Sequence, residues 1–124
     1  MSGQTDRSGF YDYPFMKFET EEAVWAVAGV IPYLGSDTEG AFKKISVVCG
    51  KQGGATTFSV RVFDRTNALL IARKSNMADD YPVLLDLGSI TNVPEGLAIL
   101  EVQIKKTAGV AGKTVTVASV VMEF

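Results

Sequence analysis

The sequence predicts an all-β domain: an eight-stranded antiparallel β-sandwich with a jelly-roll or Greek-key-like path, preceded by a flexible N-terminal arm. Short runs of alternating apolar and polar residues recur between turn-forming residues, as in β-sandwiches. No segment has the apolar spacing of a long helix. Tight hairpins alternate with longer links, whereas an up-and-down barrel would have short links throughout, so we favour the sandwich over a barrel. The expected hairpins are 49–55, 64–67 and 107–112, and the longer links are 32–40, 75–82 and 88–96.

The expected organisation is an arm over residues 1–14 and one sandwich domain over 15–124. We expect the first eight residues of the arm to form a frayed terminus. The aromatic residues Phe10, Tyr11 and Tyr13 instead suggest an arm that packs on its own domain or on a neighbouring subunit. The predicted strands cover residues 15–20, 24–31, 41–49, 56–64, 68–73, 83–87, 97–106 and 113–123.

Two strands show informative local patterns. Strand 24–31 is apolar in both phases, which predicts a central strand or one covered on both faces. Strand 56–64 ends at Asp64, which continues the inward phase but begins a tight turn. We therefore expect the Asp64 carboxylate to accept hydrogen bonds from nearby N–H groups of the turn.

The C-terminal hairpin pairs the two longest predicted strands. On strand 97–106, alternation separates a buried face from a face in water. The buried set is Ala98, Leu100, Val102 and Ile104, and the outer set is Leu97, Ile99, Glu101, Gln103 and Lys105. On strand 113–123, Val115 and Val117 face inward. After Ala118 both phases become apolar, so either a β-bulge shifts the register or both faces are covered at the chain end.

Composition limits the classes of function. With 124 residues the chain is long enough for one domain. Hydrophobic residues make up 47% and the mean hydropathy is +0.18, which favours apolar surface buried against another subunit over a merely large core. The net charge of −2 provides no general nucleic-acid footprint, and no apolar run approaches a membrane span. We expect neither a nucleic-acid nor a membrane partner, and no secretory signal.

Residues for chemistry are scarce. The chain has no histidine, which removes the commonest general base and metal ligand. The single cysteine, Cys49, lies on an inward phase and reads as a small core residue. The acidic residues lie mostly in loops or on outer strand faces, without the spacing of a known calcium loop. We therefore expect no enzyme, no cofactor and no metal site.

Trp25, Tyr33 and Tyr81 support an alternative function. Aromatic rings of this kind stack on sugar faces, so a carbohydrate- or receptor-binding β-sandwich module is the alternative to a purely structural protein. For Trp25 itself we favour a position in the core or at a subunit contact over a sugar site.

Three stretches carry a resemblance to a known group of proteins. They are Phe58-Ser-Val-Arg-Val-Phe-Asp, the Pro94-Glu-Gly turn, and the ending from Leu100 to Phe124. Over about residues 41–124 the chain resembles small jelly-roll virion proteins of tailed bacteriophages. The resemblance implies a structural protein of the virion, assembled in the host cytoplasm. It implies a capsid cement (decoration) protein, or, for the alternative function, a tail or fibre module.

If the chain is a cement protein, its functional residues form an interface. The resemblance then implies a homo-oligomer, with a homotrimer favoured, that contacts the major capsid protein or other virion proteins. From the phase of the strands, the candidate interface residues are Phe10, Tyr11, Tyr13, Leu97, Ile99 and Phe124. A bulge near Ala118 would instead turn the terminal residues inward.

Overall fold

The computed structural model describes residues 10–124, except the side chains of Phe10, Phe15 and Met16. This part contains eight strands and one short helix. They are β1 (Phe10–Thr20), β2 (Ala26–Tyr33), α1 (Ser36–Glu39), β3 (Lys44–Lys51), β4 (Thr57–Asp64), β5 (Leu69–Met77), β6 (Val83–Asp86), β7 (Ala98–Ala108) and β8 (Val115–Glu123). All eight predicted strands are present, with shifted ends. No helix here is long and apolar enough to cross a membrane.

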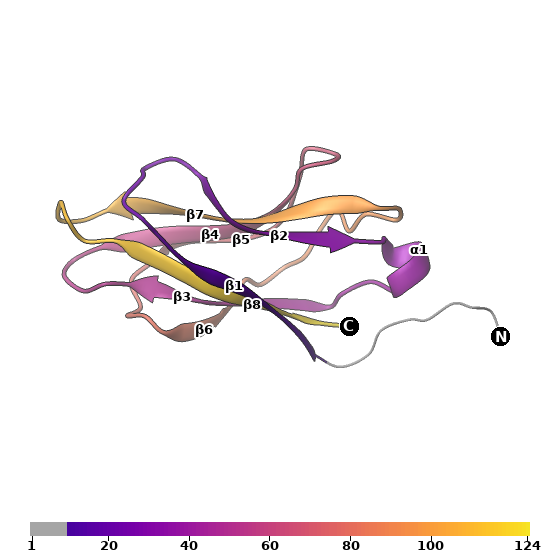
Figure 1. Cartoon of the computed structure of the whole chain (residues 1–124), viewed down its shortest axis with the longest axis horizontal. Helices are drawn as coiled ribbons and strands as arrows, with labels where there is room; N and C mark the ends of the chain where they lie inside the picture. The colour runs from indigo at the N-terminus through magenta and orange to yellow at the C-terminus, as the bar shows by residue number, and fades with distance from the viewer. Residues whose placement is uncertain (1–9) are drawn as a thin grey trace.

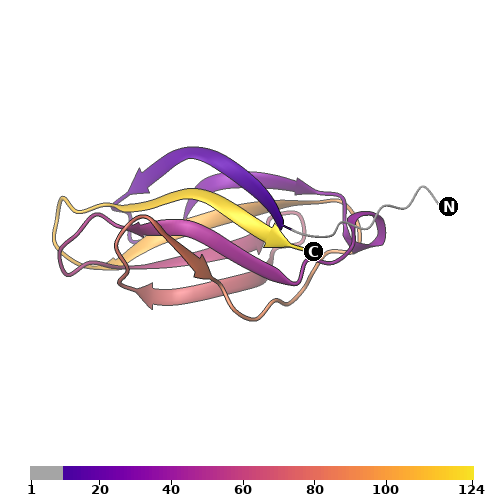
Figure 2. The same cartoon turned by 90° about the horizontal axis from the view of Figure 1, so that it is seen from below.

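The strands form two four-stranded sheets packed face to face (Figure 1). The first sheet has the order β1-β8-β3-β6, which Figure 2 shows in front, and the second has the order β2-β7-β4-β5. Their pairing is nested: β1 pairs with β8, β2 with β7, β3 with β6 and β4 with β5, all antiparallel. This is the path of one long hairpin wrapped into two layers. The predicted jelly-roll sandwich is confirmed.

Strand β1 starts earlier than the sequence suggested. It begins at Phe10 rather than at residue 15, and residues 10–14 pair with residues 119–123 of β8. This portion of the predicted arm is therefore a strand of the first sheet, because β8 offers it a full set of backbone partners. Residues 1–9 of the predicted arm lie outside the described residues.

The core lies between β7 and β8 and their neighbours. Ala98, Leu100, Val102 and Ile104 of β7 are buried, as are Val115 and Val117 of β8, which confirms the predicted inner face of the hairpin. The turn after β4 also follows prediction. Asp64 is buried, and its Oδ1 accepts a hydrogen bond of 3.0 Å from the backbone N–H of Asn67.

A β-bulge decides the direction of the chain end. On β3, Val48 and Cys49 are adjacent, but their partners on β8 are Ser119 and Val117, so Ala118 is an extra residue. The bulge turns the following apolar residues inward: Val120, Met122 and Phe124 are buried. The predicted outward position of Phe124 is therefore wrong. Its ring packs edge-on against Tyr11, with centroids 5.5 Å apart, and against Phe42 at 6.1 Å.

The prediction for strand 24–31 is also wrong. Its counterpart β2 is neither central nor covered on both faces; it is an edge strand of the second sheet. A register shift between Val27 and Gly29 leaves Ala28 partly buried against the core, while Val27 and Val30 stay exposed. Some of the apolar side chains that predicted burial, Val27 and Val30, therefore face away from the core.

Candidate interaction face

The outer face of the second sheet is built by the register of its strands. Directly opposite residues of an antiparallel pair share one face. On one side of β7, Val27 lies opposite Gln103 and Val30 opposite Glu101. On the other side, Arg61 lies opposite Gln103 and Phe63 opposite Glu101. The outer face of the second sheet, as the term is used below, comprises Trp25, Val27, Val30, Pro32, Arg61, Phe63, Arg65, Arg73, Ile99, Glu101, Gln103 and Lys105.

An apolar strip runs along the β2 side of this face. Val27 is 43% exposed and Val30 48%. Beyond the last register pair, Tyr33 with Ala98, the strip is continued by Leu34 and Leu97, which are 51% and 64% exposed. A sandwich surrounded only by water does not need apolar side chains here. A contiguous exposed apolar patch is typical of a protein-contact surface.

Two of the predicted interface residues belong to this region. Leu97 lies at the end of the apolar strip, and Ile99 lies opposite Pro32 on the outer face. The structure thus places both on the surface that alternation indicated. Their part in an interface stays a prediction.

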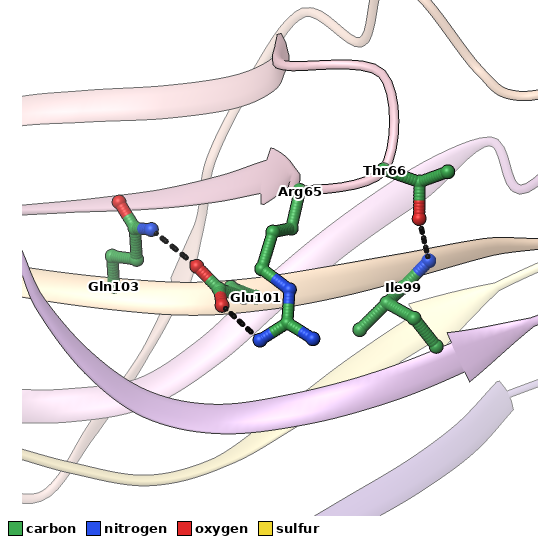
Figure 3. A network of polar contacts seen from close by, with 5 residues as sticks. All are labelled: Arg65, Thr66, Ile99, Glu101 and Gln103. Atoms are coloured by element: carbon green, nitrogen blue, oxygen red, sulfur yellow. Dashed lines mark hydrogen bonds and ion pairs between the residues drawn. The ribbon is translucent and has the colours of Figure 1, made fainter.

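A polar network occupies the middle of the face (Figure 3). Glu101 and Gln103, predicted to be in water, are each only 6% exposed. Nε2 of Gln103 donates to Oε1 of Glu101 at 2.8 Å, and Arg65 forms an ion pair with Oε2 of Glu101 at 3.2 Å. The prediction failed because β7 has neighbours on both sides, whose side chains cover its outer face. A buried carboxylate is costly unless paired, so these two partners hold Glu101 in place.

Arg61 is fixed by the same network. Its Nε donates to Oε1 of Gln103 at 2.6 Å. Its guanidinium lies over the rings of Trp25 and Phe63, at 4.4 and 4.7 Å from the centroids, as in cation–π contacts. Burial and the charge of Arg73 lower the pKa of Arg61, while Glu101 opposes the shift. Hydrogen bonding and stacking thus hold one cation rigidly on an exposed face.

The aromatic residues of the alternative sugar site are not brought together. Tyr33 is buried, with its hydroxyl donating to the carbonyl of Gly40 at 2.5 Å. Trp25 lies on the outer face of the second sheet beneath two cations, Arg61 and Lys105. Tyr81 lies against the first sheet, so close to Gly50 that a Cβ there would clash with its backbone. The three rings form no common stacking surface.

The aromatic residues of the predicted arm join the first sheet. Tyr11 and Tyr13 are half-buried in β1, opposite Met122 and Val120 of β8, and pack against the core. The side chain of Phe10 lies outside the described residues. Burial against their own domain leaves Tyr11 and Tyr13 less surface for a neighbour than an extended arm would have.

Residues 10–124 show little that could carry chemistry. No enclosed pocket forms among the described residues, and no group of three or more of their Cys, Asp or Glu side chains is placed to hold a metal ion. The Cys49 thiol is buried; burial and then the charge of Asp79 raise its pKa to about 12. Because the thiolate is the nucleophile, this thiol is unreactive near neutral pH.

The cations of this face were not among the predicted site residues. The outward phase of Arg61 beside Phe63 was visible in the sequence. Its position opposite Arg73 depends on the pairing of β4 with β5, and its bond to Gln103 on the pairing with β7. No local pattern contains this information.

Comparison with known proteins supports the fold. No family model matches the chain, and no curated protein matches it. Among solved structures, the crystal structure of the infectious bursal disease virus VP2 subviral particle is similar, with a TM-score of 0.56 and 10% sequence identity. The similarity covers 94% of this chain and 33% of the VP2 chain. The chain therefore spans about a third of the VP2 chain, and at this identity the likeness shows a shared fold.

Proposed function

We propose that this chain is a non-enzymatic structural protein of a virion, of the capsid cement (decoration) class. It would reinforce the head of a tailed bacteriophage by burying apolar surface between subunits. The observation that carries this proposal is the exposed apolar strip of Val27, Val30, Leu34 and Leu97, which residues 10–124 leave uncovered.

The fold supports the same proposal. Jelly rolls recur in the shells of viruses. One solved structure that resembles this chain over 94% of its length is that of a viral protein in a subviral particle. A face built from paired strands is largely preformed, so little conformational entropy is lost when it binds.

The mechanism is repeated burial of a modest surface. Fully burying a Val or Leu side chain contributes roughly 1.5–3 kcal/mol relative to leaving it exposed. Part of this gain is offset by the loss of translational and rotational freedom. A trimer that contacts several major capsid subunits at once would overcome this cost, because its later contacts form at high effective concentration.

Two measurements test the proposal. Sedimentation should show a stable homo-oligomer in solution, and purified chain should add in saturable fashion to parent capsids that lack it. Val30→Asp should weaken this addition by at least about tenfold, since every 1.4 kcal/mol of lost contact is tenfold in affinity.

The matched control is Leu84→Asp, which places the same charge at a somewhat more exposed apolar residue on the first sheet. It should add to capsids as the wild type does, and circular dichroism should show both variants folded. A clean monomer at high micromolar concentration, together with no addition to capsids, would refute the proposal.

A further inference from the structure

The charge of the outer face of the second sheet is opposite to that of the whole chain. The chain has a net charge of −2. This face carries four cationic side chains, Arg61, Arg65, Arg73 and Lys105, against the single carboxylate of Glu101. The excess of positive charge is local, so it would attract an acidic group to this face.

Three of these cations, Arg61, Arg73 and Lys105, have no carboxylate of their own among residues 10–124. Glu101 pairs with Arg65, and its other oxygen accepts from Gln103. Arg61 and Arg73 lie directly opposite each other on β4 and β5. Like charges in this position repel. Burial is the main cause of the lowered pKa of Arg61, and the charge of Arg73 lowers it further. A carboxylate between the two guanidinium groups would relieve this repulsion.

The position of Arg61 is prepared for such a ligand. Its Nε is occupied by Gln103 and its plane is held by Trp25 and Phe63. Gln103 is itself buried and bound to Glu101. The remaining N–H groups of a guanidinium form a rigid fork that matches a carboxylate in geometry. A side chain already held in place loses little entropy on binding.

Val27, at one end of the apolar strip, shares a row of the sheet with two of these cations. One row crosses all four strands of the second sheet, with Val27 on β2, Gln103 on β7, Arg61 on β4 and Arg73 on β5. Along this row the surface is therefore apolar at the β2 edge and cationic at the β5 edge. A matching partner carries apolar side chains beside carboxylates.

We propose that the outer face of the second sheet binds an acidic, apolar segment of another virion protein. Its carboxylates contact Arg61 and Arg73, and its apolar side chains cover Val27 and Val30. The virion origin of the partner rests on the function proposed above, whereas the chemistry of the segment rests on this face alone. A nucleic-acid strand fits less well, because a long polyanion would extend from this small cationic area over a chain that is acidic overall.

The test is a titration of the isotope-labelled full chain with a short peptide of leucine and glutamate, followed by NMR. The amide signals of residues 30, 61 and 73 should shift. A peptide with glutamine in place of every glutamate should bind at least about tenfold more weakly, and so should the glutamate peptide to Arg73→Glu. Lys113→Glu makes the same charge change in the exposed turn between β7 and β8, and its affinity should stay within about twofold of the wild type.

Three outcomes would overturn the inference. Equal binding of the glutamine peptide would show that carboxylates are not recognised. Tighter binding of oligothymidine than of the glutamate peptide would assign the face to a nucleic-acid strand. Loss of the homo-oligomer in Arg73→Glu would assign it to a second copy of this chain.

Capsid addition separates this inference from the proposed function. If Arg73→Glu adds to capsids as well as the wild type does, the inference fails and the function stands. If the wild type binds the glutamate peptide but does not add to capsids, the function fails and the chemistry of the face stands.

Discussion

The two outer faces of this sandwich handle charge in different ways. On the first sheet, charged residues form exposed local pairs: Lys17 with Glu19 at 3.2 Å and Lys44 with Asp86 at 3.8 Å. On the second sheet, Glu101 is almost fully buried and depends on Gln103 and Arg65. Exposed pairs contribute about 0–1 kcal/mol, whereas a buried carboxylate requires its partners. The outer face of the second sheet therefore depends more strongly on particular side-chain partners than the outer face of the first sheet does.

The central strands of the two faces also differ. β7 keeps its alternation from Ala98 to Ile104, so its outer residues stay outward. β8 contains the bulge at Ala118, and its last apolar residues turn into the core. A side-chain pattern thus predicts a face only while the register is unbroken. The contrast between inward Phe124 and outward Leu97 follows from this difference.

The largest expected effect tests that contrast. Phe124→Ala should lower the free energy of unfolding by about 3 kcal/mol, because it removes a buried ring that contacts Tyr11 and Phe42. Leu97→Ala should change it by less than about 0.5 kcal/mol, because this side chain is in water. Urea unfolding measures both. Similar losses in the two variants would contradict the assignment of the two faces.

The next effect concerns the buried network. Gln103→Ala should cost about 2 kcal/mol, since it leaves a buried oxygen of Glu101 without its donor. On the other outer face, Lys44→Ala breaks an exposed pair and should cost less than about 0.5 kcal/mol. Chemical denaturation of the two variants gives the comparison. A tolerated Gln103→Ala would mean that the network is not needed for stability.

A further prediction concerns the core between the two faces. The free energy of unfolding should depend on pH through the buried thiol of Cys49, because burial disfavours its charged form. The folded-state pKa of Cys49, about 12, lies above its ordinary value of 9.0. The resulting stability is fully present below pH 9 and is lost as the pH rises toward 12. At pH 10 the loss should be on the order of 1 kcal/mol relative to pH 7.

Urea titrations of the wild type and Cys49→Ala at the two pH values isolate this contribution. The variant should lack that part of the pH dependence, whereas other titrating groups affect both proteins equally. Parallel pH profiles would show that the buried thiol does not cause the loss.

The smallest effect tests the cations of the second face. Arg73→Glu should raise the free energy of unfolding by about 0.5 kcal/mol, because it replaces repulsion with attraction across from Arg61. Lys113→Glu, with the same charge change, should stay close to the wild type. Thermal unfolding at low salt detects the difference, and high salt should reduce it. Destabilisation by Arg73→Glu would show that Arg73 already has a favourable partner.

Much of the architecture was predictable from the sequence because alternation is a local property. It identified eight strands, the inner face of β7 and the turn at Asp64. It also indicated two possible outcomes after Ala118, a bulge or a doubly covered end. Of the proposed interface, it identified Leu97 and Ile99 as outward-facing.

Only the tertiary structure decided which strands became neighbours. Pairing β4 with β7 joins Arg61 to Gln103, and pairing β4 with β5 sets Arg61 opposite Arg73. The same pairings buried Glu101 and left β2 at an edge with its apolar residues exposed. The bulge, seen only in register, turned Phe124 inward. The side of a strand on which a side chain lies is set by alternation between neighbouring residues. Whether that side is covered depends on strands that are far apart in the sequence. No local pattern specifies how those strands pair.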